Sequence, residues 1–230
     1  MTLFVDSANL GDIEKAISWG VCRGVTTNPK IAAGSGVKYS PEAYRDNIRR
    51  ICELVNGPVS VELTNTMGLV PELVREAAEL YNIDRGKVVV KVPMWGSGKG
   101  LEVIHDLAVL GVPTNATCLM NAAQGILAAE TGAKYVSLFY RRMRDYYGQF
   151  QEEFDHVAAE FGDLSRYLCG KDCELIAGSI RELRDVVDCF TLGTDIVTVP
   201  PKILWELPKH PKTEATIAEF DEAWRKYTHG

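Results

Sequence analysis

The sequence predicts an α/β protein, a single (β/α)8 TIM barrel with one extra helix at its C-terminal end. Short apolar runs, often β-branched, recur roughly every 20–40 residues with helical patterns between them, as in βα units around a parallel sheet. Most of these runs are nearly continuous in apolar residues, which is typical of strands covered on both faces. No Gly-x-Gly-x-x-Gly follows an early strand, which disfavours an open dinucleotide-binding sheet.

Length and composition limit the kind of protein this can be. The chain has 230 residues and no linker rich in glycine, serine or proline, so we expect one domain over residues 1–230. Its 25 basic and 31 acidic side chains give a net charge of −6, which disfavours a nucleic-acid partner. There is no apolar run long enough for a membrane span and no signal-peptide pattern. Six cysteines without a C-x-x-C pair indicate reduced thiols, so we expect a cytoplasmic protein.

Eight strands are expected where the apolar runs lie. They are Leu3–Asp6, Gly24–Asn28, Val59–Leu63, Lys87–Val92, Val112–Cys118, Tyr135–Tyr140, Leu175–Ser179 and Ile196–Val199.

Helices are expected between the strands, because these segments carry start and stop signals. Asn9 can cap the first helix, Pro41 suits the first turn of the second, and glycine follows many helix ends. The expected helices are Leu10–Trp19, Pro41–Leu54, Leu69–Leu80, Gly100–Leu110, Ala122–Thr131, Phe150–Phe161 and Ile180–Phe190.

The segment after the last strand is expected to hold two further helices. Pro200-Pro201 opens a short one that ends by Leu207, and an amphipathic helix spans about 213–228. The aromatic stripe Phe220, Trp224 and Tyr227 could cap this barrel or dock on a neighbouring subunit. Its position in the sequence leaves both open.

The active site of such a barrel lies at the C-terminal ends of the strands, so polar residues that close the apolar runs are candidates. Seven of the eight expected strands deliver one or more. The polar candidates are Asp6, Thr26, Asn28, Glu62, Lys91, Asn115, Thr117, Ser137, Arg142, Ser179 and Arg181, and the apolar Phe139 lies at the end of the sixth run.

Lys91 is the most informative of these residues. It shares a strand face with Val89 inside a run that should be covered on both sides, and lysine is rarely buried without a purpose. One reading is a structural lysine paired with Glu62 or Asp6. The reading that we favour is a nucleophile, since an amine in dry surroundings loses its proton more readily. Attack on a carbonyl would give an imine, the electron sink for breaking or making an adjacent C–C bond.

Imine chemistry also needs groups that move protons. Asp6, Glu62 and the hydroxyl of Thr117 suit such a relay, although the carboxylates could instead be structural. Asn28 and Asn115 could bind sugar hydroxyls or satisfy strand-end backbone groups.

An anion clamp is expected from Arg142, Ser179 and Arg181. Ser179 precedes the expected helix Ile180–Phe190, whose first amides would attract a phosphate. The alternative is that these arginines are ordinary surface residues. None of the four histidines closes a strand or has metal-ligand spacing, so no metal site is expected.

The motifs FVDSAN, GVTTNP, VSVEL, VVVKVP, NAT, YVSLF and AGSIR occur in this order along the chain. Together they resemble, from residue 2 to the final helix, the short transaldolase family, which also contains the fructose-6-phosphate aldolases. The resemblance implies a class I aldolase-type barrel that needs neither metal nor organic cofactor and acts on sugar phosphates. It also implies a homo-oligomer, a pentamer or decamer, with the C-terminal helix laid over a neighbour.

The resemblance implies a role for each candidate residue. Lys91 matches the Schiff-base lysine, Asp6 the proton-transferring aspartate, and Glu62 with Thr117 the pair that holds the catalytic water. The remaining matches are Asn28 and Asn115 for the dihydroxyacetone unit, with Thr26 and Ser137 nearby, and Arg142, Ser179 and Arg181 for the phosphate.

Two positions bear on the reaction. Family members that release free dihydroxyacetone carry Gln and Tyr where this chain has Glu62 and Phe139. Transfer of a dihydroxyacetone unit between anionic sugars is therefore favoured, and an aldolase that releases it is the alternative. A non-catalytic sugar binder is disfavoured by the presence of Lys91 together with Asp6, Glu62 and Thr117.

Three basic residues depart from the family pattern. Lys30, Arg141 and Arg144 stand where the family commonly has small or acidic residues. We expect them to make the anion end of the pocket more basic or differently shaped. The hypothesis that follows is a terminal anion other than phosphate, such as a sulfonate.

Overall fold

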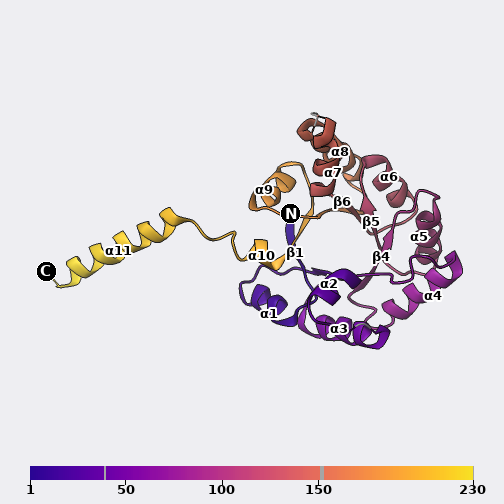
Figure 1. Ribbon diagram of the computed structural model, residues 1–230, viewed down its shortest axis with the longest axis horizontal. Helices are drawn as coiled ribbons and strands as arrows, with labels where there is room; N and C mark the ends of the chain where they lie inside the picture. The colour runs from indigo at the N-terminus through magenta and orange to yellow at the C-terminus, as the bar shows by residue number, and fades with distance from the viewer. Residues whose placement is uncertain (39, 151–152, 230) are drawn as a thin grey trace.

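The computed structural model of the chain, which describes residues 1–38, 40–150 and 153–229, confirms the closed (β/α)8 barrel. All strand pairs are parallel and follow chain order, and β8 pairs with β1 to close the ring. Helices surround the strands (Figure 1). The strands are β1 (Thr2–Asp6), β2 (Val25–Thr26), β3 (Val59–Glu62), β4 (Val88–Pro93), β5 (Thr114–Leu119), β6 (Tyr135–Phe139), β7 (Glu174–Gly178) and β8 (Ile196–Val199).

The first two predicted helices begin where the capping signals indicate. Asn9 Oδ1 accepts a hydrogen bond from the Asp12 amide at 3.1 Å, and Ser40 Oγ accepts one from the Ala43 amide at 3.1 Å. The helices are α1 (Leu10–Ser18), α2 (Pro29–Gly34), α3 (Pro41–Leu54), α4 (Val70–Tyr81), α5 (Lys99–Val109), α6 (Ala122–Glu130), α7 (Tyr140–Tyr147), α8 (Glu153–Leu168), α9 (Leu183–Thr191), α10 (Pro201–Leu204) and α11 (Pro211–His229), with a 3-10 turn at 148–150.

Two helices were not predicted. α2 has only six residues, and α7 follows β6 without a loop. α7 has only eight residues, of which Tyr140 and Met143 are the buried ones, and its run of charged side chains obscures their helical spacing in the sequence.

Two predicted helix boundaries also differ from the structure. The helix predicted at Phe150–Phe161 is replaced by α8, which continues to Leu168; residues 151–152 of the prediction lie outside the described residues. The helix predicted from Ile180 begins instead at Leu183.

The inside of the barrel has an apolar floor. Phe4, Val89, Tyr135, Ile176 and Ile196, from β1, β4, β6, β7 and β8, form a buried cluster separate from the larger core between strands and helices. Side chains along a strand alternate between its two faces, so the residue two positions further on also points inward. At four of these strands that next residue is polar: Asp6, Lys91, Ser137 and Thr198. Apolar packing at the N-terminal end therefore supports a polar chamber at the C-terminal end.

Gly24, just before β2, is required by this floor. A Cβ atom there would lie 2.7 Å from two ring atoms of Phe4 and 2.9 Å from the carbonyl oxygen of Pro58. The absence of a side chain at Gly24 lets the Phe4 ring occupy the bottom of the barrel.

The last helix, α11, stands away from the rest of the chain (Figure 1). Phe220, Trp224 and Tyr227 are 70%, 62% and 82% exposed, so the aromatic stripe does not cap its own barrel. Among the described helices, none combines the length and apolar character needed to cross a bilayer.

We expect Gly24→Ala to destabilise the fold by about 1–3 kcal/mol, because the added methyl group overpacks the barrel floor. At this chain length each kcal/mol lowers the melting temperature by about 2–4 °C, which calorimetry would measure. The matched control is Gly96→Ala, since a Cβ atom there meets nothing within 4 Å. Equal melting temperatures for the two variants would contradict the packing argument.

Candidate active site

A cavity of about 310 Å³ opens at the C-terminal ends of the strands. It brings together most of the predicted residues: Asp6, Thr26, Asn28, Lys91, Thr117, Ser137, Phe139, Arg142 and Ser179. Lys30, Ile31, Gly178 and Thr198 complete the lining. The predicted residues outside this lining are Glu62, Asn115 and Arg181.

Lys91 projects from β4 just above the apolar floor. Its strand register sets it beside Glu62 on β3 and Asn115 on β5. The side chain is 7% exposed, and Nζ lies 3.6 Å from Oε2 of Glu62. Nζ also donates a long hydrogen bond of 3.4 Å to the carbonyl oxygen of Thr27. The amine is therefore enclosed but weakly held, so it can turn toward a ligand in the cavity.

Two carboxyl groups act on Lys91: Glu62 on the neighbouring strand β3 and Asp6 on β1. Burial raises the pKa of Glu62, the positive charge of Lys91 opposes that rise, and Asp6 adds to it. Burial likewise raises the pKa of Asp6, against the charge of Lys91 and the hydrogen bond that Thr26 Oγ1 donates to Oδ1 at 2.6 Å. Each carboxyl group thus keeps a proton to higher pH than an exposed one does. Groups whose pKa values are raised in this way are typical of sites that transfer protons.

Thr117 supplies a buried hydroxyl to the cavity. Its Oγ1 has no hydrogen-bond partner within the described chain, so it can bind a ligand or a water molecule. A β-bulge follows: the β5–β6 register shifts between Ala116 and Leu119, and Cys118 has a φ of 62°. Bulges of this kind re-aim side chains next to active sites, and this one lies directly after Thr117, before β5 ends at Leu119.

Asn115 is buried in a chain of hydrogen bonds that joins three strands. Its Nδ2 donates to Ser60 Oγ at 2.9 Å, and its Oδ1 accepts from Ser137 Oγ at 2.8 Å. Asn115 therefore orients Ser137, which does line the cavity. The oxygen of Asn28 is likewise engaged, since it accepts from the Ile31 amide at 2.8 Å and caps α2.

The sequence interpretation missed Thr198. Its hydroxyl lies 2.5 Å from that of Thr26, so the eighth strand also contributes to the chamber. The signal was the alternation in Ile-Val-Thr-Val, which turns Thr198 to the same face as Ile196.

The predicted anion clamp is only partly assembled. Arg142 lines the cavity, with its guanidinium 5.1 Å from the centre of the Phe139 ring, and Ser179 lines it with a φ of 62°. The guanidinium of Arg181 instead forms an ion pair of 2.6 Å with Asp145 on α7, and both side chains are about half exposed.

The start of α9 explains the difference. The backbone amides of Arg181 and Glu182 donate to Oδ2 of the buried Asp185 at 2.9 and 3.0 Å. Arg141 binds the same carboxylate with two nitrogens. These two of the amides expected to hold a phosphate are thus satisfied within the protein, and the helix begins at Leu183.

Of the three unusual basic residues, the structure brings only Lys30 to the cavity. Arg141 pairs with Asp185 and, at 2.9 Å, with Glu182. The guanidinium of Arg144 lies 5.7 Å from the ring of Tyr140.

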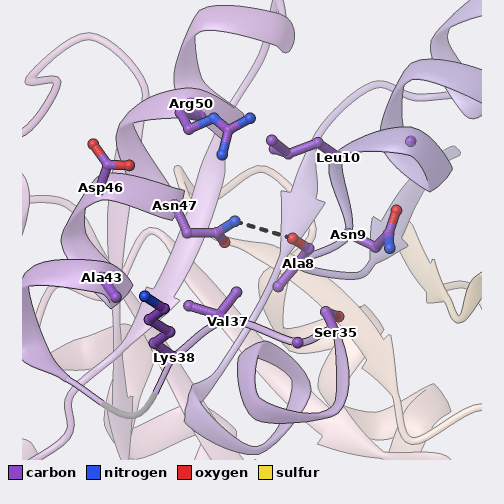
Figure 2. A pocket seen from close by; sticks show the side chains of 12 residues that line it. Ala8, Asn9, Leu10, Ser35, Val37, Lys38, Ala43, Asp46, Asn47 and Arg50 are labelled. Atoms are coloured by element: carbon purple, nitrogen blue, oxygen red, sulfur yellow. Dashed lines mark hydrogen bonds between the residues drawn. The ribbon is translucent and has the colours of Figure 1, made fainter.

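A larger hollow of about 530 Å³ lies outside the barrel mouth, between the β1–α1 loop, the segment after α2, and α3 (Figure 2). No predicted catalytic residue lines it. Its one buried polar side chain, Asn47, donates to the carbonyl oxygen of Ala8 at 3.2 Å. This contact braces the loop that follows Asp6. The larger hollow is therefore not the one that holds the predicted catalytic residues.

Within the described ranges, no cluster of three or more His, Cys, Asp and Glu side chains could hold a metal ion.

The fold and the chamber define a class: a barrel enzyme with a buried lysine amine beside the partly buried carboxyl group of Glu62, and with a second partly buried carboxyl group, that of Asp6, on the cavity wall. The family described as Transaldolase/Fructose-6-phosphate aldolase matches residues 3–229. The probable transaldolase of Desulfotalea psychrophila is 36% identical over 228 residues, which cover 99% of this chain and 100% of the relative. That of Kosmotoga olearia is 37% identical over 231 residues, covering 100% and 99%. The chain belongs to the transaldolase/fructose-6-phosphate aldolase family.

Solved structures that resemble this chain more distantly show the same barrel. An inosine 5′-monophosphate dehydrogenase from Legionella pneumophila matches with a TM-score of 0.56 at 15% identity, over 88% of this chain and 58% of that one. A mandelate oxidase matches with a TM-score of 0.57 at 15% identity, over 89% and 67%. These likenesses concern the fold alone, because this barrel supports many chemistries.

We expect Glu62→Gln to raise the melting temperature at pH 8. Because burial raises its pKa, Glu62 binds its proton more tightly when folded than when unfolded. Stability therefore falls as pH rises from the ordinary range of glutamate through the raised value. Glutamine resembles the protonated form, so its advantage should shrink on acidification to about pH 4. Calorimetry from pH 4 to 8 would measure this, with exposed Glu14→Gln as control; a pH-independent difference would contradict it.

Proposed function

We propose that the protein is a transaldolase that moves a dihydroxyacetone unit between anionic sugars through an imine on Lys91. One observation carries the proposal: the enclosed Lys91 amine at the inner end of the cavity, 3.6 Å from Glu62. Membership of an enzyme family whose relatives here are named probable transaldolases supports it.

In the proposed reaction, Lys91 Nζ attacks the ketone carbon of the donor sugar, and the carbinolamine loses water to give an imine. A carboxylate then removes the proton of the hydroxyl two carbons along. The bond between C3 and C4 of the sugar breaks. Its electrons move into the imine at C2 to form an enamine, and C4 leaves as part of an aldehyde. Attack of the enamine on an acceptor aldehyde, followed by addition of water, releases the product ketose and restores the amine.

The site residues take the following roles in this proposal. Asp6 accepts and returns the hydroxyl proton, and its raised pKa suits that exchange. Glu62 and the unpaired hydroxyl of Thr117 hold the water that enters and leaves. Thr26, Asn28 and Ser137, the last oriented by Asn115, bind the dihydroxyacetone hydroxyls. Arg142 and Ser179 bind the terminal phosphate or sulfonate.

Transfer is favoured over release by two side chains. Phe139 lines the cavity and has no hydroxyl with which to protonate the enamine, so the enamine persists until an acceptor arrives. Glu62 is a carboxylate where releasing members carry an amide. The second candidate function is an aldolase that frees dihydroxyacetone from fructose 6-phosphate or a related ketose.

Lys91→Met should abolish imine formation and lower activity by about a thousandfold or more, because the nucleophile is removed. Incubation with fructose 6-phosphate and borohydride, followed by intact-mass measurement, should show a dihydroxyacetone-sized adduct on the native protein alone. Circular dichroism would check that the variant is folded. An equal adduct on the variant would place the imine elsewhere.

The same incubation separates transfer from release. Without an acceptor aldehyde a transaldolase should liberate little dihydroxyacetone, whereas an aldolase liberates it at its full rate. Measuring the reaction rates of fructose 6-phosphate and of its 6-sulfo analogue in parallel shows which terminal anion the enzyme prefers in its donor sugar.

We also propose that α11 packs on a neighbouring subunit of a homo-oligomer, a pentamer or a decamer. Ile217, Phe220, Trp224 and Tyr227 recur at helical spacing and are all exposed. An exposed apolar stripe of this size marks a protein interface, and α11 stands clear of its own barrel (Figure 1).

The double variant Phe220→Glu/Trp224→Glu should lower the oligomeric mass measured by light scattering, because it introduces charge into the apolar stripe. The native chain should have the mass of five or ten copies. Glu219→Lys, a charge change beside the stripe, is the control and should leave the mass unchanged. A monomeric native protein, or an unaltered mass in the double variant, would refute this arrangement.

A further inference from the structure

Two cations on the wall of the active-site cavity, Lys30 and Arg142, form no ion pair with the residues that the structure describes. Within the part of the chain that the structure describes, no carboxylate oxygen lies within 4 Å of Lys30 or Arg142, although both line the cavity. The neighbouring arginines are committed elsewhere: Arg141 to Asp185 and Glu182, and Arg181 to Asp145. The charges of Lys30 and Arg142 are therefore available to an anionic ligand.

Lys30 occupies a position that helix stability does not explain. It lies in the first turn of α2, after the cap Asn28 and Pro29. The amino end of a helix carries partial positive charge, so acidic side chains are favoured there and a lysine is disfavoured. α2 has no acidic residue in its first turn. A local preference that is broken at the mouth of a cavity is typical of a functional residue.

Lys30 and Arg142 approach the cavity from opposite sides. Lys30 follows β2 and Arg142 follows β6, and these strands lie four places apart in the closed ring of eight. Both side chains are exposed at the mouth, whereas Lys91 is buried near the floor. A sugar bound to Lys91 near one end would therefore extend its other end between Lys30 and Arg142.

We propose that Lys30 is a specificity-determining residue that binds the terminal oxyanion of the sugar together with Arg142. This inference rests on the proposed function and assigns its anion recognition to the Lys30 side chain rather than to Arg181 and the backbone amides of Arg181 and Glu182 before α9. Those amides are bound to Asp185, and Arg181 is paired with Asp145. The ammonium group of lysine is a compact charge that imposes no planar geometry. It suits a tetrahedral oxyanion, whether phosphate or sulfonate.

The test is the variant Lys30→Met, assayed with an anionic and a neutral donor. The KM for fructose 6-phosphate should rise roughly tenfold or more, because a charge-assisted hydrogen bond is lost. The kcat for this donor, and both constants for unphosphorylated fructose, should change less than twofold. Lys30→Arg should restore most of the affinity. Inorganic phosphate should inhibit the native enzyme competitively and the Lys30→Met variant more weakly by a similar factor.

Two further variants test whether the effect depends on the position of the positive charge that is removed. Lys134→Met removes the same charge from the other end of the barrel, beside the first residue of β6, and should leave the KM unchanged. Arg181→Met should affect the KM less than Lys30→Met does. The proposal is overturned if the loss follows Arg181, or if Lys30→Met changes the constants for neutral and anionic donors alike.

Binding separates this inference from the proposed function. Titration of fructose 6-phosphate into Lys91→Met, with and without Lys30→Met, measures anion recognition where no imine can form. A weaker Kd in the double variant supports the inference, and an unchanged Kd overturns it. Trapping of dihydroxyacetone on native Lys91 tests the imine independently, so either proposal can fail alone.

Discussion

The two-residue alternation of the barrel strands is the constraint on which the rest of the structure depends. Each inward position at the floor is apolar, and the next inward position is polar on β1, β4, β6 and β8. Phe4 and Val89 therefore fix the depth of Asp6 and Lys91, and Gly24 gives the Phe4 ring its space. A one-residue slip in any strand would exchange the chamber residues with those that face the helices. The packing of the floor therefore determines where the polar side chains of the chamber lie.

Charge balance in the chamber follows from that depth. Lys91 is enclosed with Glu62 beside it, and Asp6 contributes a second carboxyl group from β1. Burial raises the pKa of both acids, whereas the charge of Lys91 opposes the rise. Removing ionised side chains from water into this chamber costs free energy, which other interactions of the fold must offset. The packing of the apolar floor and of the surrounding strands offsets this cost. Acids with raised pKa values of this kind are typical of sites that transfer protons.

The sequence predicted most of the barrel because strand patterns and helix caps are local signals. It placed Lys91, Asp6 and Thr117 in the chamber by the same local logic. It did not predict α7, which has few buried apolar residues, or the start of α9, where the carboxylate of Asp185 holds the backbone amides of Arg181 and Glu182. The different surroundings of Arg142, at the cavity, and Arg181, beside Asp145, arise from contacts between α7 and the start of α9 that are distant in sequence. Contacts between residues distant in sequence produce no periodic pattern of apolar residues, so the sequence does not reveal them.

The tie between α7 and α9 has a consequence for recombination among related barrels. Arg141 grips Asp185 through two nitrogens while Asp185 holds the backbone at Arg181 and Glu182, and Asp145 holds the guanidinium of Arg181. A bidentate pair of this kind demands both partners in one geometry. A chimera that imports the segment after β6 without the segment after β7 would leave Asp185 buried without its arginine. The two segments thus form one exchangeable module, and substrate range would be inherited through both together.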